Sequence, residues 1–212
     1  MDMEFIYKRH SVRKFTEEQV PEQTIKELIE AATYAPSGKN QQNWHFVVIN
    51  NTEKIAEIAR IVERKNEEMC GYLRDEAKIK GLKGMVHYQT VFKGAPVLIL
   101  IYAGSYETIA DMLLADGVMP PNEVAKYAKP NPGIQNIAAA LENLLLAAAD
   151  KGYGTCWMTG PTFADEEISE YIGFKKEGYY LAAMTPLGVP AALVKLSSPP
   201  RKPLEEVLTI IS

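Results

Sequence analysis

The sequence predicts an α+β fold built as a single domain over residues 1–212. Three observations lead to this prediction. Short continuous apolar runs are typical of buried strands, apolar residues spaced three and four apart indicate helices, and the two do not alternate strictly as βαβ units do. A chain of 212 residues can bury roughly 70% of the surface that its unfolded form exposes, so its core needs no disulfide.

The amino-terminal part of the chain predicts a helix, a strand and a second helix. Residues 16–35 have Pro21 near their start and apolar side chains at helical spacing: Ile25, Leu28, Ile29 and Ala32. Residues 46–49 form a short apolar run, which predicts a buried strand. Asn51 or Thr52 can cap the helix that follows.

Between residues 65 and 132 the pattern weakens. One clear strand is predicted over residues 95–102. Prolines at 120–121 and 130–132 bracket a stretch that we expect to be irregular, because proline cannot continue a helix.

The strongest helix is predicted from Gly133 to about Lys151. Its apolar residues cover nearly the whole circumference: Ile134, Ile137, Ala138, Leu141, Leu144, Leu145 and Ala148. A helix that is apolar all round is buried on all sides. Either it is the spine of the fold, or a second subunit covers one face, in which case Leu141 and Leu145 would face that partner.

The last third of the chain predicts two strands and two short helical segments. Residues 155–158 and 179–187 are the strands, and Thr162 can cap a short helix that begins with acidic residues. Residues 197–203 are expected to be extended, and residues 204–208 to form one helical turn.

Composition and charge exclude several classes of function. The 27 acidic residues against 23 Lys and Arg give a net charge of −4, whereas a nucleic-acid surface usually carries a basic excess. Cys70 and Cys156 lie far apart without a CxxC motif, which argues against a disulfide framework and a metal site. The chain shows no apolar leader and no long uninterrupted apolar span. We therefore expect a cytoplasmic protein that binds neither metal, nucleic acid nor membrane.

No motif indicates acid–base or nucleophilic catalysis by side chains alone. The sequence contains no GxSxG elbow, no GxxxxGK[ST] loop and no HExxH pair. Gly152-x-Gly154 ends a helix and precedes a strand, which is the reverse of the order in a dinucleotide-binding fold. If the protein is an enzyme, a bound cofactor is expected to supply the chemistry.

Three polar segments are candidates for holding a ligand. Residues 9–14 read Arg-His-Ser-Val-Arg-Lys and match the needs of a phosphate group, although a solvated basic patch would look the same. Residues 35–44 gather amides, a hydroxyl and a lysine in a turn before a strand, which a plain connecting loop could also do. Residues 154–161 lead into a Gly-Pro turn with backbone N–H groups available for a ligand, unless the turn only reverses the chain.

In their order and spacing, these segments resemble the FMN-dependent nitroreductase family over nearly all of the chain. The likeness is carried by residues 9–13 and 35–44, the helix from Gly133 with Gln135 and Asn136, the helix exit at 152–155, and residues 200–204. The resemblance implies a nitroreductase-like fold, with a central, mostly antiparallel sheet flanked by helices. It also implies an intertwined homodimer with FMN at the subunit interface.

The resemblance further implies a role for individual residues. The FMN phosphate and ribityl chain would be held by Arg9, Ser11, Arg13 and Arg201, with His10 contributing through its backbone. The loop near the flavin would supply Ser37, Gly38, Asn40 and Gln42. The reactive edge of the ring would lie against Trp157, Met158, Thr159 and Gly160, of which Thr159 and Gly160 are the catalytic candidates near N5.

The implied reaction is a ping-pong transfer of a hydride. NADH or NADPH, as a diffusible donor, would reduce the flavin at N5, and an acceptor such as a nitroaromatic or a quinone would then take the donor's place. Alternatives with the same fold are a reductive dehalogenase, a flavin-consuming enzyme and a flavin-binding protein with little turnover. Residues 65–132, rich in Tyr and Met, would form a variable lid that fixes substrate choice, unless they are ordinary core and surface residues.

Overall fold

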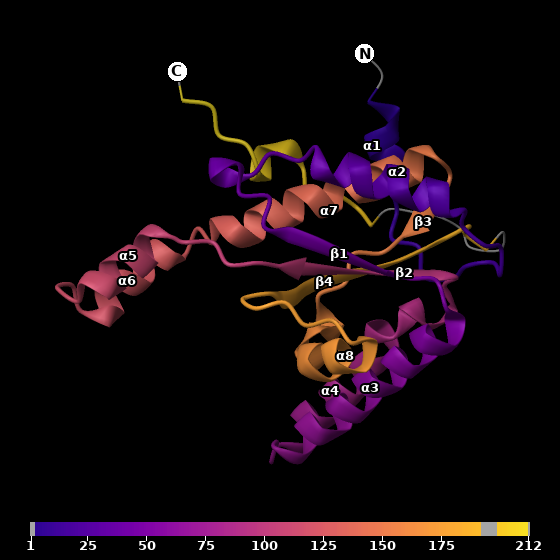
Figure 1. Ribbon diagram of the computed structural model, residues 1–212, viewed down its shortest axis with the longest axis horizontal. Helices are drawn as coiled ribbons and strands as arrows, with labels where there is room; N and C mark the ends of the chain where they lie inside the picture. Colours follow the sequence, from indigo (N-terminus) through magenta and orange to yellow (C-terminus); the bar gives the residue numbers. More distant parts are fainter. Residues whose placement is uncertain (1–2, 192–198, 212) are drawn as a thin grey trace.

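A four-stranded sheet forms the centre of the computed structural model, which describes residues 3–191 and 199–211 (Figure 1). All neighbouring strands in it are antiparallel, which confirms the predicted character of the sheet. β2 lies inside the sheet and all of its residues are buried, in keeping with its uninterrupted apolar sequence. The strands run in the order β1 (Trp44–Ile49), β2 (Val97–Ala103), β4 (Tyr180–Gly188) and β3 (Gly154–Thr155).

Helices cover both faces of the sheet (Figure 1). One apolar cluster joins the sheet to α2 (Glu22–Thr33) and α7 (Pro132–Asp150). A second cluster joins its other face to α3 (Thr52–Gly71) and α8 (Asp165–Ile172). The architecture is therefore α+β, as predicted, and α7 confirms the strongest predicted helix.

α7 packs mainly against its own chain. Leu141 and Leu145 are 0% and 1% exposed inside the cluster formed with α2 and the sheet. The expectation that they would face a partner subunit is therefore wrong, because the sheet and α2 already occupy that side of the helix. Leu146 and Ala147 are only half-buried and line a groove beside α1 (Glu4–Lys8).

The largest departure from the sequence prediction is the region 65–132, which is mostly helical outside β2. Local caps explain why the helices form: Asp75 caps the first, Thr108 and Asp111 make a capping box, and Pro121 opens the third. Apolar periodicity is weak in the first two of these helices, and each of the three buries only one residue. Besides the end of α3, the helices are α4 (Glu76–Gln89), α5 (Ile109–Asp116) and α6 (Pro121–Ala128).

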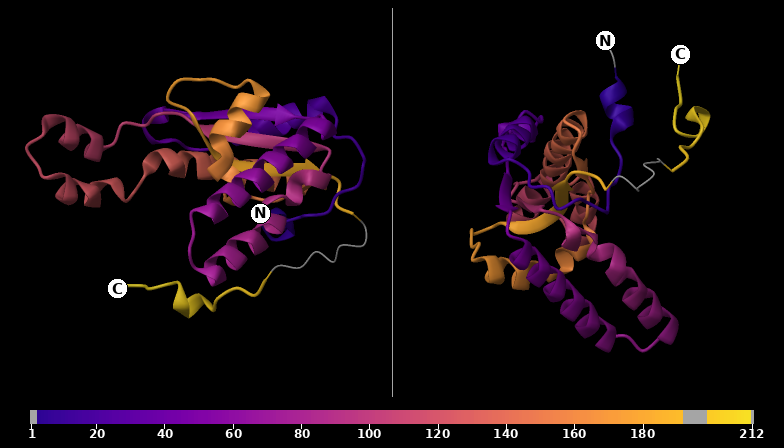
Figure 2. Two further views of the ribbon diagram at one scale, coloured as in Figure 1. Left: turned by 90° about the horizontal axis from the view of Figure 1, so that it is seen from below. Right: turned by 90° about the vertical axis from the view of Figure 1, so that its right-hand side faces the viewer.

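Two pairs of helices project from the body of the molecule (Figure 2). α3 and α4 form one hairpin. α5 and α6 form the other, and we call residues 105–131 the arm. Within the arm the two helices pack chiefly on each other. The arm is therefore attached to the rest of the chain mainly through its two ends.

Three further boundaries differ from those predicted. The helix expected over residues 16–35 begins at Glu22, because Pro21 takes an extended ψ of 138° and stands before the helix. The strand expected over residues 155–158 is reduced to β3, and beyond it only Met158 pairs with the sheet, through an isolated bridge to Met184. Thr162 does not cap α8, since it lies inside the short 3-10 helix η3 (Gly160–Ala164).

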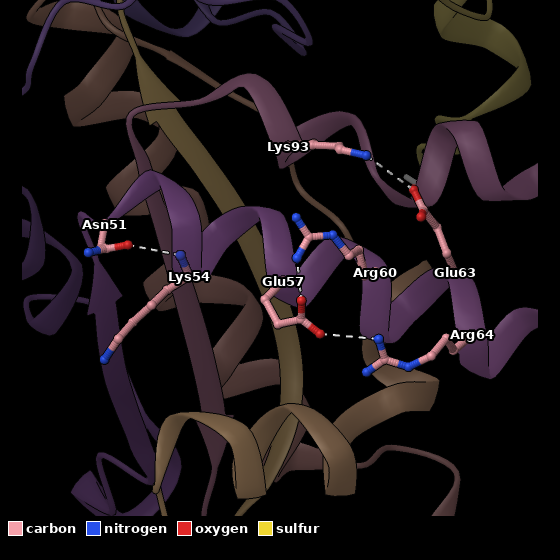
Figure 3. A network of polar contacts seen from close by, with 7 residues as sticks. All are labelled: Asn51, Lys54, Glu57, Arg60, Glu63, Arg64 and Lys93. Atoms are coloured by element: carbon pink, nitrogen blue, oxygen red, sulfur yellow. Dashed lines mark hydrogen bonds and ion pairs between the residues drawn. The ribbon is translucent and has the colours of Figure 1, made fainter.

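A polar network lies on the solvent side of α3 (Figure 3). Asn51 caps the helix by accepting a hydrogen bond from the Lys54 amide at 2.9 Å. Glu57 accepts hydrogen bonds from Arg60 and Arg64, and these donors hold the pKa of the Glu57 carboxyl below its ordinary value. Exposed ion pairs of this kind contribute little to stability, so we assign the network to helix support alone.

The carboxy-terminal residues 199–211 form an exposed tail that stands away from the sheet (Figure 2). It contains the short helix η4 (Leu204–Glu206), which confirms the helical turn predicted over residues 204–208. Residues 197 and 198 of the segment predicted to be extended lie outside the described residues. Across residues 3–191 and 199–211, no helix has the length and apolar character needed to cross a membrane.

Candidate functional site

The segment 9–13, which we call the basic segment, lies against β3. The Val12 amide donates to the Thr155 carbonyl at 2.8 Å, and Ser11 forms a parallel bridge with the same residue. A Cβ on Gly154 would lie only 2.6 Å from Val12 Cβ, so a glycine is needed for the two backbones to approach. The contact fixes the basic segment beside β3, the strand that follows α7.

The cationic groups of the basic segment gather near Cys156. Burial raises the pKa of the Cys156 thiol, while the charges of Arg13 and Arg9 and a hydrogen bond with Ser11 act in the opposite direction. Arg13 also donates to the Ser11 carbonyl at 3.2 Å. Arg9 Nε lies 3.7 Å from a carboxylate oxygen of Glu142 on α7. The structure therefore brings Arg9, Ser11 and Arg13 together at one place. His10, which follows Arg9 in the sequence, is half-buried.

Residues 37–42, which we call the polar loop, adopt an unusual backbone. Lys39, Asn40 and Gln42 have φ values of 55°, 51° and 44°, in the left-handed region that non-glycine residues rarely occupy. The Gln42 amide donates to Ser37 Oγ at 3.1 Å, and Gln42 Nε2 donates to Asn40 Oδ1 at 3.0 Å. The four residues predicted here thus belong to one folded loop with its polar groups at the surface.

A buried asparagine pair holds the polar loop, and the sequence analysis assigned no role to it. Asn136 Nδ2 on α7 donates to Asn43 Oδ1 at 2.8 Å, and Asn136 Oδ1 accepts from the Gly38 amide at 3.0 Å. Both asparagines are 5% exposed. Buried polar side chains are normally satisfied, and an asparagine within an apolar helix was the available signal.

The Tyr106 side chain lies against Gly38 of the polar loop. The Tyr106 side chain is so close that a Cβ on Gly38 would lie 2.5 Å from its Oη. A Cβ on Gly133 would lie 2.8 Å from Tyr106 Cβ. Lys39 Nζ lies 5.8 Å from the centre of the tyrosine ring. A side chain at position 133 would therefore displace the base of Tyr106, whereas one at position 38 would displace its hydroxyl end.

Residues 157–160, which we call the amide turn, have a buried half and an exposed half. Met158 is 6% exposed and exchanges two backbone hydrogen bonds with Met184, at 2.9 and 2.8 Å, so it offers a ligand little beyond van der Waals contact. Trp157 is 37% exposed. Within residues 3–191, the amides of Thr159 and Gly160 donate no hydrogen bond, as expected where a helix begins.

A cavity of about 650 Å³ lies apart from these segments, between α8 and the loop before β4. Its wall includes Tyr102, whose hydroxyl bonds Ser169 Oγ at 2.8 Å, and Phe174. The His45 ring stacks on Phe174 at 5.0 Å between ring centres. Burial, together with the nearby charge of Lys176, lowers the pKa of His45.

We expect His45 to titrate below the ordinary histidine range, and Lys176→Gln to raise its pKa. The unfolded chain then takes up a proton at higher pH than the folded protein, so the free energy of unfolding falls as the pH drops through the interval between the two pKa values. An NMR titration of the three histidines checks this. An unshifted His45, or an unchanged value in the variant, would contradict it.

The structure joins the basic segment to residues 154–161, because Ser11 and Val12 both pair with Thr155. In the part of the chain that the structure describes, Arg9, Ser11 and Arg13 make no hydrogen bond or ion pair with the polar loop. Arg201 lies in the exposed tail. No group of three or more potential metal ligands occurs in the described part of the chain.

Comparison with known proteins identifies the class to which this fold and these segments belong. The model of the Nitroreductase family matches residues 6–189, so the chain belongs to the nitroreductase family. The chain is 37% identical to a BluB-like flavoprotein of Clostridium difficile 630, with full coverage of both chains and a TM-score of 0.92. A nitroreductase with bound FMN from Bacteroides fragilis NCTC 9343 shares the fold, with 24% identity, a TM-score of 0.73, and 99% and 98% coverage.

Two further relatives carry the names of enzymes with different reactions. The chain is 27% identical over 209 residues to the iodotyrosine deiodinase of Nematostella vectensis, covering 96% of this chain and 72% of the relative. It is 26% identical over 156 residues to a putative NADH dehydrogenase/NAD(P)H nitroreductase of Methanothermobacter thermautotrophicus, covering 73% and 59%. The homologues thus indicate an oxidoreductase.

Proposed function

We propose that this protein is an FMN-dependent oxidoreductase that uses NADH or NADPH. The observation that carries the proposal is the basic segment, where two guanidinium groups and a hydroxyl gather against β3 in a member of the nitroreductase family. FMN-bound relatives with this fold support the choice of cofactor. The chemistry that bound FMN supplies is transfer of a hydride from the donor, through N5, to an acceptor such as a nitroaromatic or a quinone.

The residues present fit FMN in charge and in hydrogen-bonding capacity. Arg9, Arg13 and Ser11 suit a phosphate, because a guanidinium presents a planar pair of donors and a hydroxyl adds a neutral one. The amides of Thr159 and Gly160 are available to donate at the edge of the ring, where preorganised donors stabilise developing negative charge. The polar loop offers Ser37, Gly38, Asn40 and Gln42 for further polar contacts with the ring.

We propose that two copies of the chain complete each site. In the described part of the chain, Arg9, Ser11 and Arg13 make no hydrogen bond or ion pair with the polar loop, and Arg201 lies in an exposed tail, so we expect a second copy to complete the site. The tail exposes apolar side chains, including Ile210 at 81% and Ile211 at 93%. The outer strand β1 borders a groove of about 520 Å³, lined in part by Ile25, Ile29 and Val48, which such a tail would cover.

Removing residues 204–212 is expected to convert a dimer into monomers, because the exposed apolar tail would no longer cover a second copy. Sedimentation velocity of the full and shortened chains at equal concentration measures this. The proposal predicts a dimer for the full chain alone. A dimer in both samples, or a full-length monomer, would count against it.

Steady-state kinetics test the proposed reaction. With NADH or NADPH varied at several fixed concentrations of a quinone, we expect parallel double-reciprocal plots, because donor and acceptor would occupy the same site in turn. Intersecting lines would rule out a ping-pong sequence.

Reductive dehalogenation is the second candidate, favoured by the 27% identity to iodotyrosine deiodinase. Release of iodide from iodotyrosine under reducing conditions, without quinone reduction by NADH or NADPH, would select it. Loss of flavin during turnover would instead select a flavin-consuming reaction. Tight FMN binding with neither reaction would indicate a flavin-binding protein with little turnover.

A further inference from the structure

We propose that Tyr106 is a positioning residue that couples the arm to the polar loop, so that arm position and FMN binding influence each other. The inference rests on the proposed function. Tyr106 stands near the start of the arm, three residues after β2, and is half-buried. Its ring reaches from Gly133 at the start of α7 to Gly38 in the polar loop.

Both ends of the arm are fixed beside the polar loop. At the start of the arm, the Gly104 amide donates to the Asn43 carbonyl at 2.6 Å, and Asn43 Nδ2 donates to the Gly104 carbonyl at 3.1 Å. At its end, Asn43 Nδ2 also lies 3.3 Å from the Gly133 carbonyl. Asn43 directly follows the polar loop, so a movement at the base of the arm acts directly on that loop.

The polar loop needs support from outside itself. Its three left-handed residues, Lys39, Asn40 and Gln42, occupy a backbone region that persists only where the surroundings enforce it. Asn136 accepts a hydrogen bond from the Gly38 amide, and the end of the Tyr106 side chain lies against the same glycine. Withdrawal of Tyr106 with the arm would therefore release the loop that we propose contacts FMN.

Between its two fixed ends, the arm has few contacts with the body. Its helices pack chiefly on each other, and several apolar side chains on it face solvent, among them Ile109 (65% exposed), Met112 (56%) and Val118 (89%). Coupling free energy is reciprocal: if the arm sets the affinity for FMN, then FMN must also stabilise the arm. Both directions can be measured.

The first test is a double-mutant cycle on FMN affinity, measured by quenching of flavin fluorescence. Gly38→Ala should weaken binding about tenfold, because the new methyl group would overlap Tyr106 Oη at 2.5 Å. Adding Tyr106→Phe should restore most of the loss, since the next ring atoms lie at 3.3 and 3.4 Å.

Gly133→Ala is the matched control for this cycle. Its methyl group would meet Tyr106 Cβ at 2.8 Å, an atom that phenylalanine retains, so Tyr106→Phe should not restore that variant. Failure of Tyr106→Phe to rescue Gly38→Ala, or equal rescue of both alanine variants, would overturn the role of Tyr106. So would an unchanged FMN affinity in Gly38→Ala.

The second test is tryptic cleavage after Lys126, an exposed site on the arm, with and without saturating FMN. FMN should slow this cleavage in the wild-type protein and not in Tyr106→Ala, whereas cleavage after Arg74, on the α3–α4 hairpin, should be unaffected in both. Equal protection of the arm in both proteins, or none in an FMN-binding wild type, would overturn the coupling alone. A wild-type protein that binds no FMN would overturn the proposed function itself.

Discussion

Replacing Arg9 or Arg201 by alanine is expected to weaken FMN binding about tenfold to a hundredfold, or about 1.5–3 kcal/mol. Each change would remove a charge-assisted hydrogen bond to the phosphate. Arg9 sits where the structure gathers Ser11 and Arg13, and its ion pair with Glu142 is a long one, at 3.7 Å. Titration of the apoprotein with FMN, followed by fluorescence, gives the dissociation constants.

Arg74→Ala is the control for general loss of positive charge, because Arg74 is exposed on the α3–α4 hairpin, apart from the basic segment. Arg9→Lys separates charge from geometry, since lysine keeps the charge and loses the planar pair of donors. If FMN binds both alanine variants as tightly as the wild type, neither arginine belongs to the phosphate site.

Replacing Asn136 by alanine is expected to lower the free energy of unfolding by about 1–3 kcal/mol, because buried polar partners would be left unsatisfied. Those partners are Asn43 Oδ1 and the Gly38 amide. Since the polar loop loses its hydrogen bonds to α7, FMN affinity should fall as well. Urea denaturation and FMN titration of the same preparation measure the two effects.

Asn143→Ala, on the same helix, is the matched control. Asn143 is half-buried and makes a single long hydrogen bond, at 3.4 Å, to the Ala31 carbonyl. It should cost less stability than Asn136→Ala and leave FMN affinity intact. Equal effects of the two substitutions would show that the Asn136 network has no special role in the polar loop.

The parts of the fold that sequence could predict are those in which one residue pattern dominates. β2 is continuously apolar and is buried throughout, and α7 follows the predicted bounds within about one residue. The helices α4 and α5 escaped prediction because local caps rather than an apolar stripe support them, and α6 because it is short and begins at Pro121. Leu141 and Leu145 were wrongly assigned to a partner interface. The reason is that apolar residues all around a helix do not show which element covers each side of it.

The residues of the candidate site also differ in whether the sequence could predict them. Charged and polar residues within one segment, such as Arg9 and Arg13, were found together because they are close in sequence. Asn43, Asn136 and Tyr106 were assigned no role, because their role depends on contacts between segments far apart in the chain. The left-handed backbone of the polar loop is likewise set by those contacts, since Lys39 and Gln42 have no intrinsic preference for it.

The visible absorption spectrum of the FMN-loaded protein, recorded before and after anaerobic addition of NADH and then NADPH, is the decisive test of the proposed flavin reduction. We predict a two-banded oxidised flavin spectrum that bleaches with at least one of the two donors. A flavin spectrum that stays oxidised with both would contradict the nicotinamide-dependent reaction. A protein that remains colourless after incubation with FMN would contradict the account of the site as a whole.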